Sequence, residues 1–100
     1  MKEAGTLLVE LLEKQKVDRV YCVPGESYLS VMNGLQDTSI ETILCKHEGA
    51  ASIMAEADGK LTGRPGIAFV TRGPGATNAA AGVHIAQQDS TPMILFVGQI

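Results

Sequence analysis

The sequence predicts an α/β protein with a doubly wound parallel sheet of about four strands and helices on both faces. Short apolar runs alternate along the chain with longer stretches whose apolar residues recur at helical spacing. The strand-like runs are continuously apolar, which is typical of parallel strands buried on both faces. We expect the strand order 2-1-3-4, with strand one between strands two and three.

Two helices and two strands are expected in the first half of the chain. Residues 3–16 carry leucines on one stripe, which predicts an amphipathic helix; these are Leu7, Leu8, Leu11 and Leu12. The β-branched run 17–23 predicts the first strand, which stops at the breaker pair Pro24-Gly25. A shorter helix over 29–35, with Val31, Met32 and Leu35 inward, precedes a second strand over 41–45.

The second half repeats this alternation. A helix rich in small residues is expected over 48–61, and the stretch 62–66, Thr-Gly-Arg-Pro-Gly, is its stop signal. Strand three follows over 67–71. A fourth helix over 77–88 comes after a glycine-rich turn, and strand four runs over 93–97.

Parallel strands place all their strand-to-helix loops at one edge of the sheet, where ligands bind in open α/β folds. Loops far apart in the sequence should therefore line one rim; they are 24–27, 46–48, 71–78 and 98–99. Glu48 stands where strand two turns into a helix, so it suits a general acid/base or a hydrogen-bond partner for a heterocycle. The alternative is a simple acid in a first helical turn, favoured by the helix dipole. For His47 we favour a structural hydrogen bond, because neighbours in an extended strand point to opposite faces.

Composition excludes several classes of function. The net charge of −3 argues against a nucleic-acid partner, and no apolar run is long enough to span a membrane. Cys22 and Cys45 lie in apolar runs, which favours reduced thiols in a cytoplasmic protein. No metal site is expected, since no His or Cys set has ligand spacing. Gly73-Pro74-Gly75 matches neither phosphate-binding loop pattern.

The chain has the length of one small domain and shows no internal boundary. Strand four is followed at once by the last residues, with no helix to cover it. We therefore expect residues 1–100 to be part of a longer chain.

The loops together resemble a known family. The motifs are Val23-Pro24-Gly25-Glu26, Lys46-His47-Glu48-Gly49-Ala50-Ala51, Met54-Ala55-Glu56-Ala57-Asp58-Gly59, Gly63-Arg64-Pro65-Gly66, Arg72-Gly73-Pro74-Gly75-Ala76-Thr77-Asn78, Asp89-Ser90-Thr91-Pro92 and Gly98-Gln99. In order and spacing they look like the N-terminal pyrimidine-binding domain of thiamine-diphosphate enzymes, nearest to acetolactate synthase large subunits. The resemblance covers essentially the whole chain.

The resemblance implies a role for each loop. Glu48 would hydrogen-bond the aminopyrimidine of thiamine diphosphate as the catalytic residue. The residues expected around the cofactor are Pro24, Gly25, Glu48, Gly73, Pro74, Gly75 and Asn78. Those expected to face a 2-keto acid, pyruvate first, are Glu26, Thr71 and Gln99. Mg²⁺ would be bound by a separate domain, FAD is allowed, and the active unit would be a homodimer or homotetramer.

Two departures keep alternatives open. Acetolactate synthases commonly have a second glycine where this chain has Glu26, and often a glutamine where it has Gly49. The implied reaction is decarboxylation of a 2-keto acid followed by ligation to a second carbonyl compound, as in branched-chain amino acid biosynthesis. A 2-keto acid decarboxylase of the same family is the first alternative. A non-catalytic nucleotide-binding or regulatory α/β module is the second.

Overall fold

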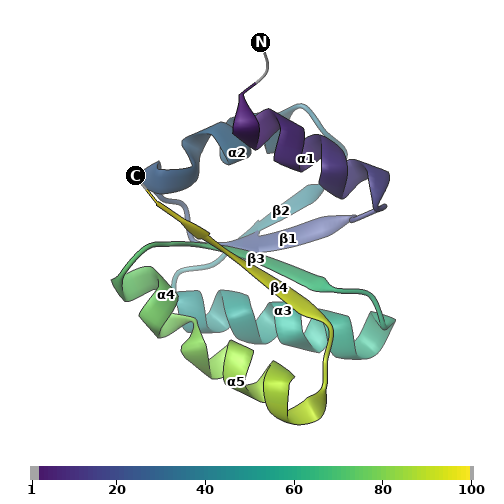
Figure 1. The fold of residues 1–100 in the computed structure, drawn as a ribbon, viewed down its shortest axis with the longest axis vertical. Coiled ribbons are helices and arrows are strands. Elements are labelled where there is room, and N and C mark those ends of the chain that lie inside the picture. Colours follow the sequence, from purple (N-terminus) through teal and green to yellow (C-terminus); the bar gives the residue numbers. More distant parts are fainter. Residues whose placement is uncertain (1–2, 100) are drawn as a thin grey trace.

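The computed structural model describes residues 3–99, except for the side chain of Glu26, and contains one four-stranded sheet between two layers of helices (Figure 1). The elements are α1 (Ala4–Lys14), β1 (Arg19–Cys22), the 3-10 turn η1 (Glu26–Tyr28), α2 (Leu29–Gln36), β2 (Glu41–Leu44), α3 (Glu48–Thr62), β3 (Gly66–Thr71), α4 (Pro74–Asn78), α5 (Ala80–Asp89) and β4 (Met93–Gly98). Every strand pair is parallel, and the order β2-β1-β3-β4 confirms the predicted topology.

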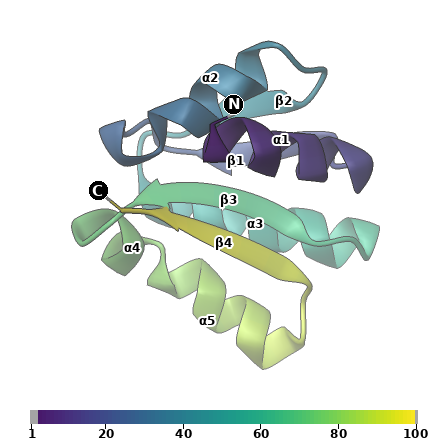
Figure 2. The same ribbon diagram turned by 45° about the horizontal axis from the view of Figure 1, so that its top comes forward.

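The sheet has an apolar core on each face. Helices α1 and α2 lie on one side of it and α3 and α5 on the other (Figure 2). Successive strand residues point to opposite faces, so Cys22 and Phe69 join the core under α1 and α2, whereas Tyr21 and Ala68 join the core under α3. The doubly wound class is therefore confirmed.

Small residues let the α3 layer lie close to the sheet. Ala51 and Ala55 of α3 are fully buried. A Cβ at Gly66 of β3 would overlap the Ala55 carbonyl, and one at Gly82 of α5 would overlap Ser52 of α3. These close contacts set how near α3 packs to β3 and to α5.

The leucine stripe predicted for the first helix was wrong in part. Leu12 is buried, but Leu7 and Leu11 are 47% and 57% exposed. The buried face of α1 is formed by Gly5, Val9 and Leu12. A Cβ at Gly5 would overlap Ser30, so the glycine lets α2 pack closely against α1. This close packing rotates α1 so that Gly5, Val9 and Leu12 face the core.

The single helix predicted over 77–88 is two helices. Pro74 occupies the first turn of α4, after Gly73 in a left-handed conformation (φ 64°). Proline is well suited to the first helical position, because its missing N–H would have no helical partner. Ala79 separates α4 from α5. The turn η1 was not predicted, and the other bounds agree with the expected ones to within two residues.

None of the helices in the described part of the chain is long and apolar enough to cross a membrane.

Candidate functional site at the carboxyl edge of the sheet

The loops after the strands meet at one edge, as the parallel sheet predicts. Ser27, after β1, and Thr71, at the end of β3, hydrogen-bond through their hydroxyls at 2.7 Å. A Cβ at Gly98, the last residue of β4, would overlap Ser27. Asn78 of α4 reaches Glu48, at the start of α3, over 3.1 Å. These contacts place the ends of all four strands around one rim.

Glu48 is half-buried at this rim and is the first residue of α3. Its Oε1 accepts a hydrogen bond from Nδ2 of Asn78. No described residue donates a hydrogen bond to its Oε2, which lies 3.5 Å from the position a Cβ would take at Gly75. The carboxylate therefore has one oxygen held by the protein and one available to a ligand.

His47 has a structural role. It is the N-cap of α3, with extended backbone (φ −147°, ψ 141°), and its Nδ1 accepts a hydrogen bond from the Gly49 N–H at 2.9 Å. An N-cap side chain satisfies a backbone donor that has no partner within the helix. The ring is thus engaged beside Glu48.

The loop Gly73-Pro74-Gly75 lies across the rim from α3. Gly73 and Pro74 are exposed, and Gly75 is buried. A Cβ at Gly75 would come within 2.8 Å of Thr71 Cγ2 as well as near Glu48. Only a glycine leaves this space open beside the free carboxylate oxygen.

The other predicted residues that the structure describes belong to loops or strand ends at this edge and differ in exposure. Gly25 packs near Thr71, with its Cβ position 3.2 Å from Thr71 Cβ, while Pro24 is exposed. Gln99 follows β4 and is exposed. The side chain of Glu26 lies outside the described part of the structure.

Two further residues contribute to the rim: Ser27, which was expected there only as part of the loop 24–27, and Tyr28, which was not expected there. Ser27 joins the ends of β1, β3 and β4 through its contacts with Thr71 and Gly98. Tyr28 is 6% exposed, and its hydroxyl has no hydrogen-bond partner among the described residues. Burial raises the pKa of the Tyr28 phenol, and the nearby Cys22 and Glu48 raise it further. The phenol therefore stays neutral. Serine and tyrosine after a Pro-Gly turn carry no pattern that would identify them in advance.

The two cysteines are free thiols on opposite faces of the sheet. Burial raises the pKa of Cys22 to about 11 and also raises that of Cys45. A thiol needs a lowered pKa to act as a nucleophile near neutral pH. Neither thiol has such a lowered pKa.

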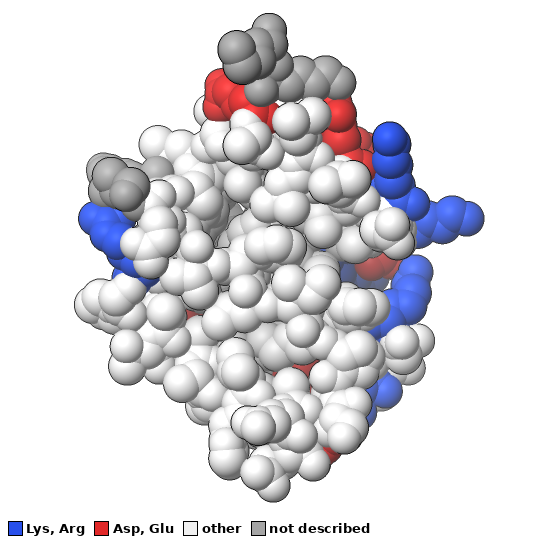
Figure 3. Space-filling view, viewed as in Figure 1, with Lys and Arg blue, Asp and Glu red and all other residues white. Residues whose placement is uncertain are grey.

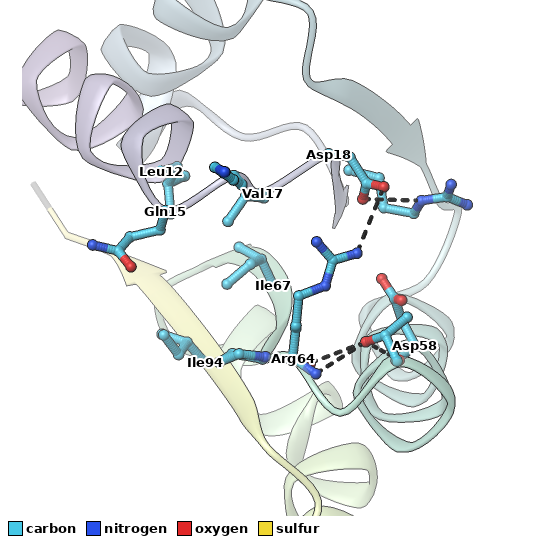
Figure 4. Close-up of a pocket in the computed structure, with 12 residues that line it drawn as sticks. Leu12, Gln15, Val17, Asp18, Asp58, Arg64, Ile67 and Ile94 are labelled. Carbon is cyan, nitrogen blue, oxygen red and sulfur yellow. Dashed lines mark hydrogen bonds and ion pairs between the residues drawn. The ribbon is translucent and has the colours of Figure 1, made fainter.

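A cavity of about 460 Å³ lies at the opposite edge of the sheet, near the start of the strands (Figure 4). Its floor is apolar and includes Leu12, Ile67 and Ile94. Three of its charged residues pair with one another, since Asp18 lies 3.5 Å from Arg19 and 4.0 Å from Arg64. We assign the site to the carboxyl edge, because the free oxygen of Glu48 lies there and parallel sheets bind ligands at that edge.

No group of three or more His, Cys, Asp or Glu side chains within the described residues is arranged to hold a metal ion.

Comparison with known proteins gives a consistent result. Residues 2–100 match the family described as "Thiamine pyrophosphate enzyme, N-terminal TPP binding domain". The chain is 40% identical over 94 residues to an acetolactate synthase of Bacillus subtilis, covering 94% of this chain and 16% of the relative. It is 39% identical over 92 residues to a "Probable 2-ketoarginine decarboxylase" of Pseudomonas aeruginosa, covering 92% and 16%. It is 37% identical over 98 residues to a pyruvate oxidase of Lactiplantibacillus plantarum, covering 96% and 16%.

Proposed function

We propose a function from the premise that this chain belongs to the family of thiamine pyrophosphate enzymes, as their N-terminal TPP binding domain. Residues 1–100 then form the first part of the domain that binds the aminopyrimidine of thiamine diphosphate, incomplete by itself, within a longer enzyme. The chain spans about 16% of the length of the three relatives compared above, which supports this proposal.

The carboxyl-edge site suits the polar edge of an aminopyrimidine, both in its hydrogen-bonding groups and in the space beside them. Oε2 of Glu48 has no partner among the described residues. A protonated carboxyl group there would donate a hydrogen bond to the ring nitrogen N1′ of the neutral aminopyrimidine, and the carboxylate would accept one from protonated N1′. Gly75 leaves room beside that oxygen. The residues proposed to surround the cofactor are Pro24, Gly25, Glu48, Gly73, Pro74, Gly75 and Asn78.

Thiamine diphosphate, when bound, supplies the acidic C2–H group and the electron sink that decarboxylation of a 2-keto acid needs. The contribution of this chain is to hold and orient. Glu48 shares a proton with N1′ of the pyrimidine, in the role of a positioned general acid/base. Thr71, Gln99 and Glu26 are proposed to face the substrate from the same rim.

The proposed overall reaction is decarboxylation of a 2-keto acid, pyruvate first, and ligation of the resulting fragment to a second carbonyl compound, as in branched-chain amino acid biosynthesis. The similarity to acetolactate synthase supports it. Simple decarboxylation is the second candidate. The acidic Glu26 in the loop after β1 and the similarity to a 2-ketoarginine decarboxylase favour that alternative. A non-catalytic nucleotide-binding or regulatory α/β module is the candidate of another class.

The further partners follow from the same premise. We propose that Mg²⁺ binds the diphosphate through a separate domain, that FAD is an additional cofactor option, and that the enzyme is a homodimer or homotetramer. The similarity to a pyruvate oxidase, whose name describes an oxidation, supports keeping a redox cofactor as an option. Two free thiols, Cys22 and Cys45, are consistent with a cytoplasmic location.

The half-buried carboxylate of Glu48 with one free oxygen carries the proposal, and Glu48→Gln in the full-length protein tests it. Glutamine keeps the volume but cannot exchange the proton. Hydrogen–deuterium exchange at C2 of bound thiamine diphosphate should therefore slow by about two orders of magnitude or more, a typical contribution of a positioned acid/base. Cofactor affinity should fall only modestly.

The matched control is Glu41→Gln, which changes an exposed glutamate at the start of β2, on the opposite edge of the sheet. It should leave C2 exchange unchanged. Glu26→Gln should alter the preference among 2-keto acids more than C2 exchange. Near-normal exchange in Glu48→Gln would reduce Glu48 to an acid of the first helical turn and refute the proposed function.

A further inference from the structure

The two oxygens of the Glu48 carboxylate have different surroundings. Oε1 accepts a hydrogen bond from Nδ2 of Asn78 at 3.1 Å, and Oε2 faces Gly75 without a donor among the described residues. A carboxylate that is free to rotate would exchange these two positions. Because the two oxygens are chemically equivalent, what the hydrogen bond from Asn78 fixes is the orientation of the carboxylate, with one oxygen held and the other facing the open side.

Asn78 is placed for this contact by the short helix α4. It is the last residue of that helix, and α4 begins at Pro74 directly after β3. The backbone carbonyl of Asn78 lies 3.3 Å from the position a Cβ would take at Gly49, the residue after Glu48. The absence of a side chain at Gly49 thus lets the end of α4 approach the start of α3.

The chemistry of an amide suits this position. Asparagine donates a hydrogen bond through its NH₂ group and carries no titratable proton. A hydrogen bond to a charged acceptor favours the charged form of that acceptor. Asn78 can therefore orient the carboxylate of Glu48 without competing for the proton that Glu48 shares with a ligand.

We propose that Asn78 is a positioning residue that holds Glu48 through Oε1 and directs Oε2 toward the aminopyrimidine of the cofactor. This inference rests on the proposed function and refines it. It replaces the expectation that Asn78 contacts the cofactor itself with a role exerted through Glu48. In this arrangement Oε1 of Glu48 is held by Asn78, and Oε2 is the oxygen that exchanges the proton with the cofactor.

A pair of variants in the full-length protein tests the proposal. Asn78→Leu keeps similar volume and removes the donor, so C2 exchange of bound thiamine diphosphate should slow about tenfold, the effect of losing roughly one hydrogen bond. Asn78→Gln retains an NH₂ donor on an exposed side chain and should recover most of the rate. Asn33→Leu, at an exposed asparagine of α2, is the matched control and should exchange normally.

A double-mutant cycle with Glu48→Gln separates a role through Glu48 from an independent one. Asn78→Leu should slow exchange much less when Glu48 is already glutamine. The dissociation constant of the cofactor, measured by calorimetry, should rise no more than about threefold in Asn78→Leu, which is below 1 kcal/mol. A direct contact between Asn78 and the cofactor would give a larger loss of affinity.

Three results would overturn the inference: normal C2 exchange in Asn78→Leu, an equal slowing in both Glu48 backgrounds, or no recovery in Asn78→Gln. If Glu48→Gln alone exchanges normally, the proposed function itself fails. If Glu48→Gln slows exchange while Asn78→Leu does not, only the role of Asn78 fails.

Discussion

His47 and Glu48 are neighbours in the sequence but have separate tasks. His47 has extended backbone, so its ring turns back to cap α3, whereas Glu48 is already helical and presents its carboxylate to Asn78. The ring occupies the space beside Gly49, where a Cβ would lie 2.9 Å from His47 Nδ1. The cap and the small following residue together define the position of Glu48.

Removing this cap should loosen the first turn of α3. We expect His47→Ala to destabilise that turn by about 0.5–2 kcal/mol, the usual cost of losing an N-cap. Hydrogen exchange followed by mass spectrometry on the full-length protein should show faster exchange at the first amides of α3 and little change at its C-terminal end. His47→Asn provides another N-cap acceptor and should restore protection. Unchanged exchange in His47→Ala would show that the hydrogen bond to Gly49 contributes nothing.

At the scale of elements, a buried carboxylate ties α3 to the turn before β4. Glu56 of α3 is 5% exposed, and its Oε2 accepts a hydrogen bond from Thr91 Oγ1 at 2.6 Å. Lys60 lies 3.3 Å from the same oxygen and 2.6 Å from Asp89 at the end of α5. The approach of Asp89 and then of Glu56 raises the pKa of Lys60. This network fixes the connection between α5 and the edge strand.

Breaking the network should cost more through its hydrogen bond than through its ion pair. We expect Glu56→Ala to lower the free energy of unfolding by about 1–3 kcal/mol, because it leaves a partly buried hydroxyl without its acceptor. Glu56→Gln keeps an acceptor for Thr91 and loses only the ion pair with Lys60, which is screened by solvent and should contribute much less to stability. Urea unfolding of the three proteins measures the difference. Equal losses in both variants would mean that charge, and not the hydrogen bond, is what matters at Glu56.

The sequence was sufficient for the order and type of the main elements, because parallel strands buried on both faces leave a clear apolar pattern. It did not predict the rotation of α1, since close approach of α2 at Gly5 decides which leucines are buried. It also missed the break at Ala79, where the residue itself is a good helix former. Asn78 was expected in the site, but its contact with Glu48 depends on where that break occurs.

At the scale of the whole molecule, the sheet has a free edge at β4. That strand pairs only with β3 among the described strands. Ile94 and Val97 of β4 are 42% and 39% exposed. The face shown in Figure 3, viewed as in Figure 1 with β4 in front, carries few charged side chains away from its margins. An apolar strand edge without charges is a surface on which another chain or segment can pair.

We therefore predict that the isolated chain self-associates through this edge. Light scattering over a range of concentrations should give a mass above 10.5 kDa, the mass of one chain, and a hydrophobic dye should bind. Val97→Lys places a charge on β4 and should shift the chain toward monomers, because lysines on edge strands oppose further pairing. Leu61→Lys is the matched control: Leu61 is 87% exposed, but it lies near the end of α3 beside Asp58 and Arg19, away from β4. It should leave the association unchanged. A monomeric chain that binds no dye would contradict self-association through the β4 edge. If Val97→Lys and Leu61→Lys reduced association equally, the cause would be the change in net charge and not the strand edge.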